Sequence, residues 1–280
     1  MRMDIIKPFD PWKSKLCTCP EKFSLNPYTG CSHKCTYCYS TYIPNFYSLR
    51  TKKDVIKRVE KDLEKIPENS IISMSNSSDP YPGVERKLEI TRKILELLKE
   101  YDMRVLIVTK SDIVARDVDL LSEMRCAVSV SISTLKFFRT FEPNAVDPEM
   151  RIRAMKVLKD NNIPVILRLD PVIPFKTENE IDSILNSCDF VDHVVSSTLK
   201  LRYDSLKRVI SSNPELSFFR NIYLNLGEKI QNSFYLPAQI RRDILNAVKE
   251  KCEEMGISYA FCREGFRFRA GSCDGTHLIK

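Results

Sequence analysis

The sequence predicts an α/β fold built on a parallel sheet of six strands, and two observations support this prediction. First, short β-branched runs alternate regularly with longer segments along most of the 280 residues. Second, the longer segments carry apolar residues at helical spacing with charges on the opposite face, as residues 87–101 do. Strands that alternate with helices form right-handed βαβ units and hence a parallel sheet. Six such units can curl into an open barrel or lie flat, and both arrangements put functional residues after the carboxyl ends of the strands.

The expected elements follow one another along the chain. Runs rich in β-branched residues predict strands at residues 21–26, 70–75, 104–110, 127–133, 163–170 and 191–197. The amphipathic segments between them predict helices at residues 51–66, 87–101, 114–124, 147–162 and 177–187. Beyond residue 200 the alternation loosens. One more helix is expected at residues 237–256, because Pro237 suits its start and Gly256 its end, and a short strand follows at residues 258–261.

Composition narrows the class of protein. The chain contains 43% hydrophobic and 29% charged residues, with a net charge of +7. This mild basic excess suits either an anionic partner, such as nucleic acid or a phosphorylated small molecule, or simply a basic surface. We find no stretch of about 18 apolar residues and no apolar leader in residues 1–15, so we expect a cytoplasmic protein. Ten cysteines in such a chain favour metal binding over disulfides.

The densest group of cysteines lies in "GCSHKCTYCYS", residues 30–40, directly after the first expected strand. Cys31, Cys35 and Cys38 are one thiol short of the four that close a zinc or iron–sulfur site. Three thiolates can hold a [4Fe–4S] cube and leave one iron free for a substrate or cofactor. The same three can also be part of a zinc site that is completed elsewhere, so the spacing alone leaves both metals open.

The pattern C-x3-C-x2-C, with Tyr37 before its last cysteine, resembles the radical S-adenosylmethionine (SAM) superfamily. The resemblance implies a [4Fe–4S] cluster on these three cysteines, SAM bound at the free iron, and hydrogen abstraction by a 5′-deoxyadenosyl radical. It also implies an external one-electron reductant of the flavodoxin or ferredoxin type. The fold that it implies is a partial (β/α)6 barrel, a three-quarter TIM-type barrel, here followed by a C-terminal helical and extended segment.

Finer features, covering about residues 23–200, are similar to the spore photoproduct lyase-like group. They are "NPYTGCSHKCTYCY", "SSDPYPGVERKLEITRKILELL" and "VTKSD". The resemblance implies that Ser78, Lys110 and Ser131 hold SAM. A charged residue at the end of an apolar strand, as Lys110 is, independently suggests an anion partner, although a solvated strand end is the simpler reading. One position departs from the lyases: Asn76 stands where they carry the cysteine that returns a hydrogen atom, so repair of the spore DNA lesion is not expected.

Other residues of the expected strand ends are weaker candidates. Tyr37 and Tyr39 either flank the cofactor or pack the core. Five residues at the ends of the expected strands or in the C-terminal tail are candidate substrate contacts, namely Asp79, Tyr81, Arg168, Asp170 and Arg267. In the tail, arginines alternate with phenylalanines around Arg267, which would suit either a lid that clamps a base and a phosphate or a simple edge strand.

The remaining cysteines divide into two sets. Cys126, Cys188 and Cys252 occur singly at apolar or helical positions, where a free cysteine packs as a small hydrophobe. The second set contains four thiols that could complete a second cluster or a zinc site, namely Cys17, Cys19, Cys262 and Cys273. Because the two ends of the chain would have to meet, we expect these thiols to remain unpaired and no second metal site to form.

The sequence therefore predicts a radical SAM enzyme with an N-terminal extension at residues 1–20, a core barrel at residues 21–200 and a C-terminal extension at residues 201–280 that covers the barrel mouth. The preferred substrate is a modified nucleobase or nucleoside, free or in RNA, and the reaction could be a C–C lyase reaction. The alternatives are a radical SAM enzyme that modifies peptides or matures a cofactor, and a metal-containing nucleic-acid-binding module without catalysis.

Overall fold

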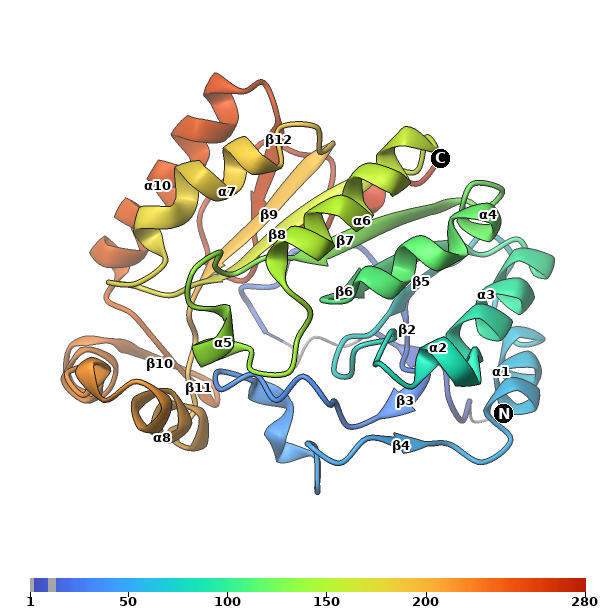
Figure 1. Ribbon diagram of the computed structural model, residues 1–280, viewed down its shortest axis with the longest axis horizontal. Coiled ribbons are helices and arrows are strands. Elements are labelled where there is room, and N and C mark those ends of the chain that lie inside the picture. Colours follow the sequence, from blue (N-terminus) through green and yellow to red (C-terminus); the bar gives the residue numbers. More distant parts are fainter. Residues whose placement is uncertain (1–2, 10–13) are drawn as a thin grey trace.

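An open, mostly parallel sheet of eight strands forms the centre of the protein, seen in a computed structural model that describes residues 3–9 and 14–280 (Figure 1). Its strand order is β1-β2-β5-β6-β7-β8-β9-β12, and only β1 is antiparallel to its neighbour. In the described part of the chain β1 and β12 form its two edges, so the sheet is a partial barrel. Its strands are β1 (Lys7–Pro8), β2 (Phe23–Leu25), β5 (Ile71–Met74), β6 (Arg104–Thr109), β7 (Cys126–Ser131), β8 (Val165–Val172), β9 (His193–Thr198) and β12 (Ser258–Phe261).

All six expected strands are confirmed, as β2 and β5 to β9. Two small hairpin-like sheets lie outside the main one, formed by β3 (Tyr28–Thr29) with β4 (Arg50–Thr51) and by β10 (Glu228–Ile230) with β11 (Ser233–Tyr235). The first of them joins the two ends of the cysteine-containing loop. The second lies at residues 228–235, where the sequence pattern predicted no strand.

Helices cover the outer face of the sheet, and Figure 1 shows α3, α4, α6 and α7 on its near side, with α10 beside the edge formed by β12. The α-helices are α1 (Val55–Leu63), α2 (Glu85–Leu88), α3 (Ile90–Glu100), α4 (Val118–Leu121), α5 (Phe138–Phe141), α6 (Pro148–Asp160), α7 (Ile181–Ser187), α8 (Tyr203–Ser212), α9 (Phe219–Asn221) and α10 (Ala238–Glu254). Short 3-10 helices span Tyr39–Tyr42, Asp112–Asp117, Glu178–Glu180, Pro214–Leu216 and Thr276–Leu278, and a π-helix spans Ile222–Leu226. The expected helices at 51–66 and 114–124 are shorter than predicted, because residue 51 belongs to β4 and Asp112–Asp117 is a 3-10 turn.

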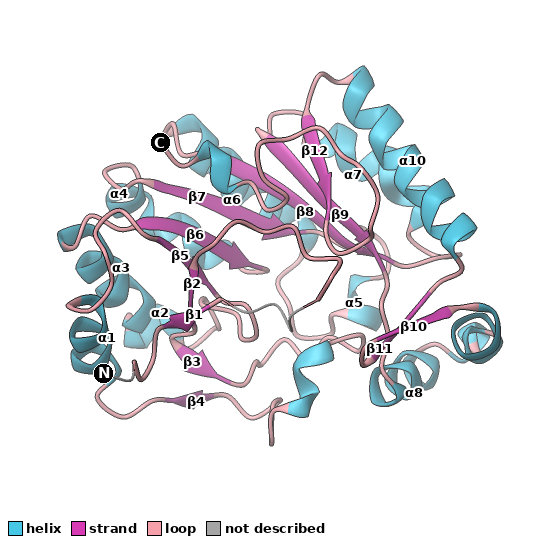
Figure 2. Ribbon diagram, turned by 180° about the vertical axis from the view of Figure 1, so that it is seen from behind, coloured by secondary structure: helices cyan, strands magenta, loops and turns pink. Residues whose placement is uncertain are grey.

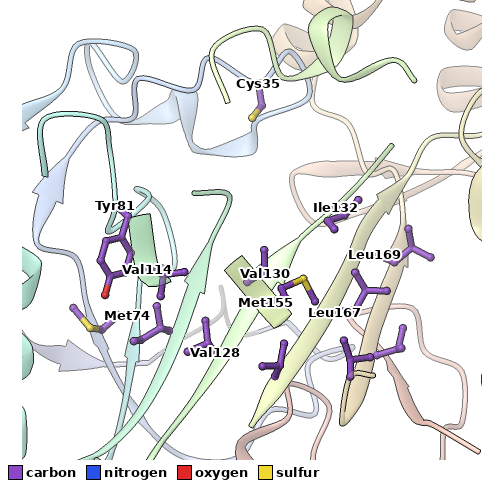
Figure 3. Packing of buried hydrophobic residues seen from close by; sticks show 14 of the residues in the cluster. Cys35, Met74, Tyr81, Val114, Val128, Val130, Ile132, Met155, Leu167 and Leu169 are labelled. Atoms are coloured by element: carbon purple, nitrogen blue, oxygen red, sulfur yellow. The ribbon is translucent and has the colours of Figure 1, made fainter. Parts of the chain in front are cut away.

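The two faces of each strand pack against different partners. On β6, Val105 and Ile107 belong to the main core between the sheet and the helices, whereas Leu106 faces the other way. Figure 3 shows part of this main core, with Val128 and Val130 of β7 beside Leu167 of β8. This alternation follows from the two-residue period of a strand, and burial on both faces explains why the strands are apolar almost throughout.

The C-terminal extension is built into the barrel. Its strand β12 pairs with β9, and the chain then returns across the inner face of the sheet, where Ile279 packs against the cluster that contains Leu106 and Ile166 (Figure 2). Arg267 is exposed between two half-buried phenylalanines, Phe266 and Phe268, as an alternating segment should be. None of the described helices is long and apolar enough to cross a membrane.

Candidate active site

The three clustered cysteines lie on the long loop between β3 and β4, which follows the carboxyl end of β2. Gly30 starts the loop with φ of +80°, and a Cβ there would lie 2.4 Å from the Ser48 carbonyl oxygen, so only glycine fits. The Cys31 N–H donates to the Phe46 carbonyl at 2.7 Å. These contacts close the loop on itself and bring its cysteine segment back over the sheet.

The three thiols lie in a largely buried environment that contains both anionic and cationic side chains, with Glu142 acting on Cys35 and Asp79 on Cys31. Burial raises the pKa of Cys31 to about 12 and also raises the pKa of Cys35 and Cys38. Lys110 opposes this effect at Cys35 and Cys38, and Arg208 opposes it at Cys38. A ligating cysteine must be a thiolate, so these cations would offset the charge that ligation leaves in a buried site.

This donor set fits a [4Fe–4S] cluster with three protein ligands. Within residues 3–9 and 14–280, no three His, Cys, Asp or Glu side chains are placed so that they could hold a single metal ion. A cube requires a different arrangement, because each thiolate binds its own iron. Soft thiol donors and compensating cations are the features that favour the cluster here.

Asp79 ties the cysteine loop to the ends of β5 and β6. Its carboxylate accepts hydrogen bonds from the Thr109 hydroxyl at 2.8 Å and from the Lys110 N–H at 2.7 Å. It also accepts one from the Tyr81 N–H at 2.9 Å and lies 3.6 Å from the His33 ring. A carboxylate with this many local donors orders the loops, and the expected contact of Asp79 with substrate stays a prediction.

Lys110 joins a buried group of charged residues below the cysteine loop. Lys110 Nζ lies 3.1 Å from Glu142 Oε1, and Arg151 lies 2.7 Å from the other Glu142 oxygen. The Tyr37 hydroxyl donates to the same carboxylate and contacts Ser133 at 3.1 Å. Burial alone would raise the pKa of Glu142, but the charges of Arg151 and Lys110 outweigh it and lower that pKa. Tyr37 is therefore a packed, hydrogen-bonded core residue that supports Glu142.

Ser78 and Ser131 stand near the same end of the sheet, and both are almost fully buried. The Ser78 N–H donates to the Asn26 side-chain oxygen at 3.3 Å, and Ser77 uses the same oxygen through its N–H at 3.2 Å. The Ser131 carbonyl accepts a hydrogen bond from Arg151 at 2.9 Å. These hydrogen bonds hold the backbone at Ser78 and at Ser131 in place. The role of the two hydroxyls in holding SAM stays a prediction.

Tyr39 and Asn76 meet at the rim. The Tyr39 hydroxyl donates to the Asn76 carbonyl at 2.5 Å, while the Asn76 amide donates to the Ser24 hydroxyl at 2.7 Å. Tyr39 is 43% exposed, so it lies at the open side of the loop and not in the core.

The residues that were expected to contact substrate do not lie together in the structure. Arg168 and Asp170 form an ion pair of 2.8 Å at the end of β8, and the Ser197 hydroxyl donates to Asp170 at 2.5 Å. Tyr81, by contrast, is fully buried in the main core (Figure 3), so the expectation that it contacts substrate is corrected. A rim position in the sequence does not fix which way a side chain points. Arg267 is exposed on the tail.

Sequence reasoning missed several residues that shape this site. Arg208 of α8 donates to the Cys38 carbonyl at 2.7 Å and to the Thr36 carbonyl at 3.1 Å, so the C-terminal extension anchors the cysteine loop. Glu142, Arg151 and Asn26 were missed as well. The first two lie in a charged stretch that reads as exposed helix and turn, and only their pairing in space reveals them.

The comparisons with known proteins agree with this geometry. The model of the Radical SAM superfamily matches residues 25–188, more than half of the chain. An uncharacterized protein of Methanocaldococcus jannaschii, MJ0683, is 32% identical over 178 residues, which cover 60% of this chain and 65% of that protein. ORF301 of Acidianus two-tailed virus, also uncharacterized, is 30% identical over 171 residues, covering 54% of this chain and 56% of that protein. The chain thus spans less than two thirds of the length of either relative.

Among solved structures, spore photoproduct lyase complexed with dinucleoside spore photoproduct has a TM-score of 0.69 at 13% identity, covering 92% of this chain and 78% of that chain. SuiB of Streptococcus suis bound to its precursor peptide SuiA has a TM-score of 0.57 at 15% identity, covering 85% and 48%. At these identities the likeness is one of fold. Together with the family match and the cysteine loop, it places the chain in the radical SAM superfamily.

Proposed function

We propose that this protein is a radical SAM enzyme in which Cys31, Cys35 and Cys38 hold a [4Fe–4S] cluster. The observation that carries the proposal is the placement of three thiols, one buried and two half-buried, on the loop that follows β2, where the charge of Lys110 acts on Cys35 and Cys38. When bound, such a cluster supplies the electron that cleaves the sulfonium of SAM and yields a 5′-deoxyadenosyl radical. The other residues of the site would bind and orient SAM and the substrate, and they would exclude water.

The residues below the loop would provide the cofactor contacts. Arg151 is enough to neutralise Glu142, so the charge of Lys110 is available to a second anion, which we assign to the methionine carboxylate of SAM. Glu142 then orients Lys110. Ser78 and Ser131 are small hydrogen-bonding groups on the neighbouring strand ends and suit the amino group or the ribose.

For the substrate we favour a modified nucleobase or nucleoside, free or in RNA, with C–C bond cleavage as the candidate reaction. Support comes from the fold shared with a lyase solved with a dinucleoside, and from the net charge of +7. Asn76 argues against the same lesion, because an amide does not return a hydrogen atom as a thiol does. The likeness to SuiB, solved with a peptide, supports peptide modification as the second candidate, at a lower TM-score.

The test separates an enzyme from a binding module. After anaerobic reconstitution with iron and sulfide, the protein should bind about four irons and, on reduction with SAM present, release 5′-deoxyadenosine. Modified nucleosides, an oligoribonucleotide and a peptide are then added in parallel, and the candidate that raises 5′-deoxyadenosine release and changes mass identifies the substrate class. A reconstituted, reduced protein that leaves SAM intact would refute the enzyme and favour the nucleic-acid-binding module.

A further inference from the structure

Four cysteines outside the cysteine loop lie together, although they come from opposite ends of the chain. The Cys273 thiol donates to the Cys19 sulfur at 3.2 Å, across 254 residues of sequence. Cys17, two residues before Cys19, interacts electrostatically with it. Cys262 is close enough to influence the charge of Cys17 and Cys273. A shared site requires the two ends of the chain to meet, and the fold brings them together.

The fold holds the two segments together through contacts other than the thiols. Lys22 and Asp274 form a buried ion pair three and one residues beyond Cys19 and Cys273. A Cβ at Gly265 would lie 3.2 Å from the Leu16 side chain, so this side chain packs closely on the Gly265 backbone. The convergence of the four thiols thus results from a packed interface.

Two cations stand beside the four thiols. Arg168 lies 3.5 Å from the Cys262 sulfur, and Lys22 pairs with Asp274, the residue after Cys273. A thiolate is the form that binds metal, and nearby cations favour it. The other free cysteines differ, because Cys126 and Cys188 are buried singly in the apolar core.

We infer that Cys17, Cys19, Cys262 and Cys273 are the ligands of a second metal centre, separate from the one on the cysteine loop. Four thiolates suit either a zinc ion or an iron–sulfur cluster. Among the described residues no three thiols surround a single point as they stand, so ligation requires Cys19 and Cys273 to turn from each other toward the shared metal. Arg168 also pairs with Asp170, so the second centre borders the carboxyl end of β8.

The test uses the full chain without the first site. A Cys31→Ala, Cys35→Ala, Cys38→Ala variant is purified without oxygen, reconstituted with iron and sulfide or with zinc, and analysed for iron, sulfide and zinc. We expect it to retain about four irons or about one zinc per chain, and the metal that is retained identifies the centre. Adding Cys262→Ala and Cys273→Ala should remove that metal, whereas adding Cys126→Ala and Cys252→Ala should not. Equal metal content in these two five-site variants would overturn the inference.

A second measurement uses the unaltered protein and so does not depend on how the variants fold. The native protein is alkylated before and after a chelator is added, and the modified cysteines are located by mass spectrometry. Protection of Cys17, Cys19, Cys262 and Cys273 that ends with chelation supports the second centre. Alkylation without chelator, or a Cys19–Cys273 disulfide in metal-free protein, overturns it. Neither measurement involves SAM. A failure of the second metal centre can therefore be told apart from a failure of the proposed SAM cleavage.

Discussion

Lys110 Nζ lies 3.1 Å from Glu142 Oε1, beside a fully buried Arg151 that binds the other oxygen of the same carboxylate. Two cations thus share one anion below the cysteine loop. The Arg151 side chain is fully buried, so its charge requires Glu142 as a counter-ion. The Lys110 side chain, by contrast, is 15% exposed. The two contacts should therefore respond differently to substitution, because Arg151 supports the fold whereas our proposal assigns Lys110 to the cofactor.

Replacing Lys110 by Met should weaken SAM binding while the cluster is retained. A hydrogen bond to a charged group contributes about 1.5–3 kcal/mol, which corresponds to a loss of affinity of about 10- to 150-fold. The dissociation constant of SAM is measured by calorimetry on reconstituted protein, with Lys99→Met, on the exposed face of α3, as the matched control. If Lys110→Met binds SAM as tightly as the control, Lys110 serves only Glu142.

Replacing Glu142 by Gln should destabilise the fold more than it weakens SAM binding. The amide leaves Arg151 buried without a counter-charge, and breaking a buried ion pair in this way costs about 3–5 kcal/mol. The free energy of unfolding is measured in urea and compared with Glu123→Gln, which removes a partner of Lys99 from an exposed pair and should change it by less than about 0.5 kcal/mol. Similar stability of the two variants would show that Arg151 finds another acceptor.

The sequence predicted the parts of this site that depend on local pattern, and missed those that depend on pairing in space. β-branched runs placed all six barrel strands, and so also the cysteine loop and Lys110 at strand ends. Glu142 and Arg151 could not be found in this way, because a charged side chain in a turn or helix is usually exposed. The contact between Cys19 and Cys273 joins segments 254 residues apart, which no periodicity encodes. Tyr81 shows the converse error, since a strand-end position did not reveal that its ring turns into the core.

Replacing any one of Cys31, Cys35 and Cys38 by Ala should abolish 5′-deoxyadenosine formation and remove the iron bound at this site. A cube left with two thiolate ligands has two unprotected irons and is lost. Iron content and 5′-deoxyadenosine are measured after identical reconstitution, with Cys252→Ala, a buried cysteine of α10, as the control that keeps both. Full activity in any of the three single variants would remove that cysteine from the ligand set.

Replacing Arg208 by Ala should make the cluster labile without removing any ligand. The guanidinium holds the Thr36 and Cys38 carbonyls, and each such bond from a charged donor contributes about 1.5–3 kcal/mol to the order of the loop. We expect the rate of iron loss to a chelator to rise at least about tenfold, as a change of about 1.4 kcal/mol would produce. Arg220→Ala, an exposed arginine of α9, is the control, and equal rates for the two variants would argue that α8 does not support the loop.

Replacing Asp62 by Asn should remove a component of stability that depends on pH. The Asp62 carboxylate on α1 accepts the backbone N–H groups of Ile5 at 2.6 Å and Ile6 at 3.0 Å, and so holds the N-terminal segment against the barrel. Burial alone would raise the pKa of Asp62, but these backbone donors outweigh it and lower that pKa.

The sign of the pH effect follows from the lowered pKa of Asp62. A carboxyl group whose folded pKa lies below its unfolded value of about 3.9 contributes stability that is fully present above about pH 5 and is lost as the pH falls through the folded pKa. At pH 7 Asp62→Asn should therefore lower the free energy of unfolding by about 1.5–3 kcal/mol, the contribution of a hydrogen-bonded charge. The difference from the unaltered protein should shrink as the pH falls below about 4. Urea unfolding at several pH values measures it, with Asp54→Asn, an exposed residue before α1, as the control. A difference that stays constant down to pH 3 would mean that Asp62 acts through its shape and not through its charge.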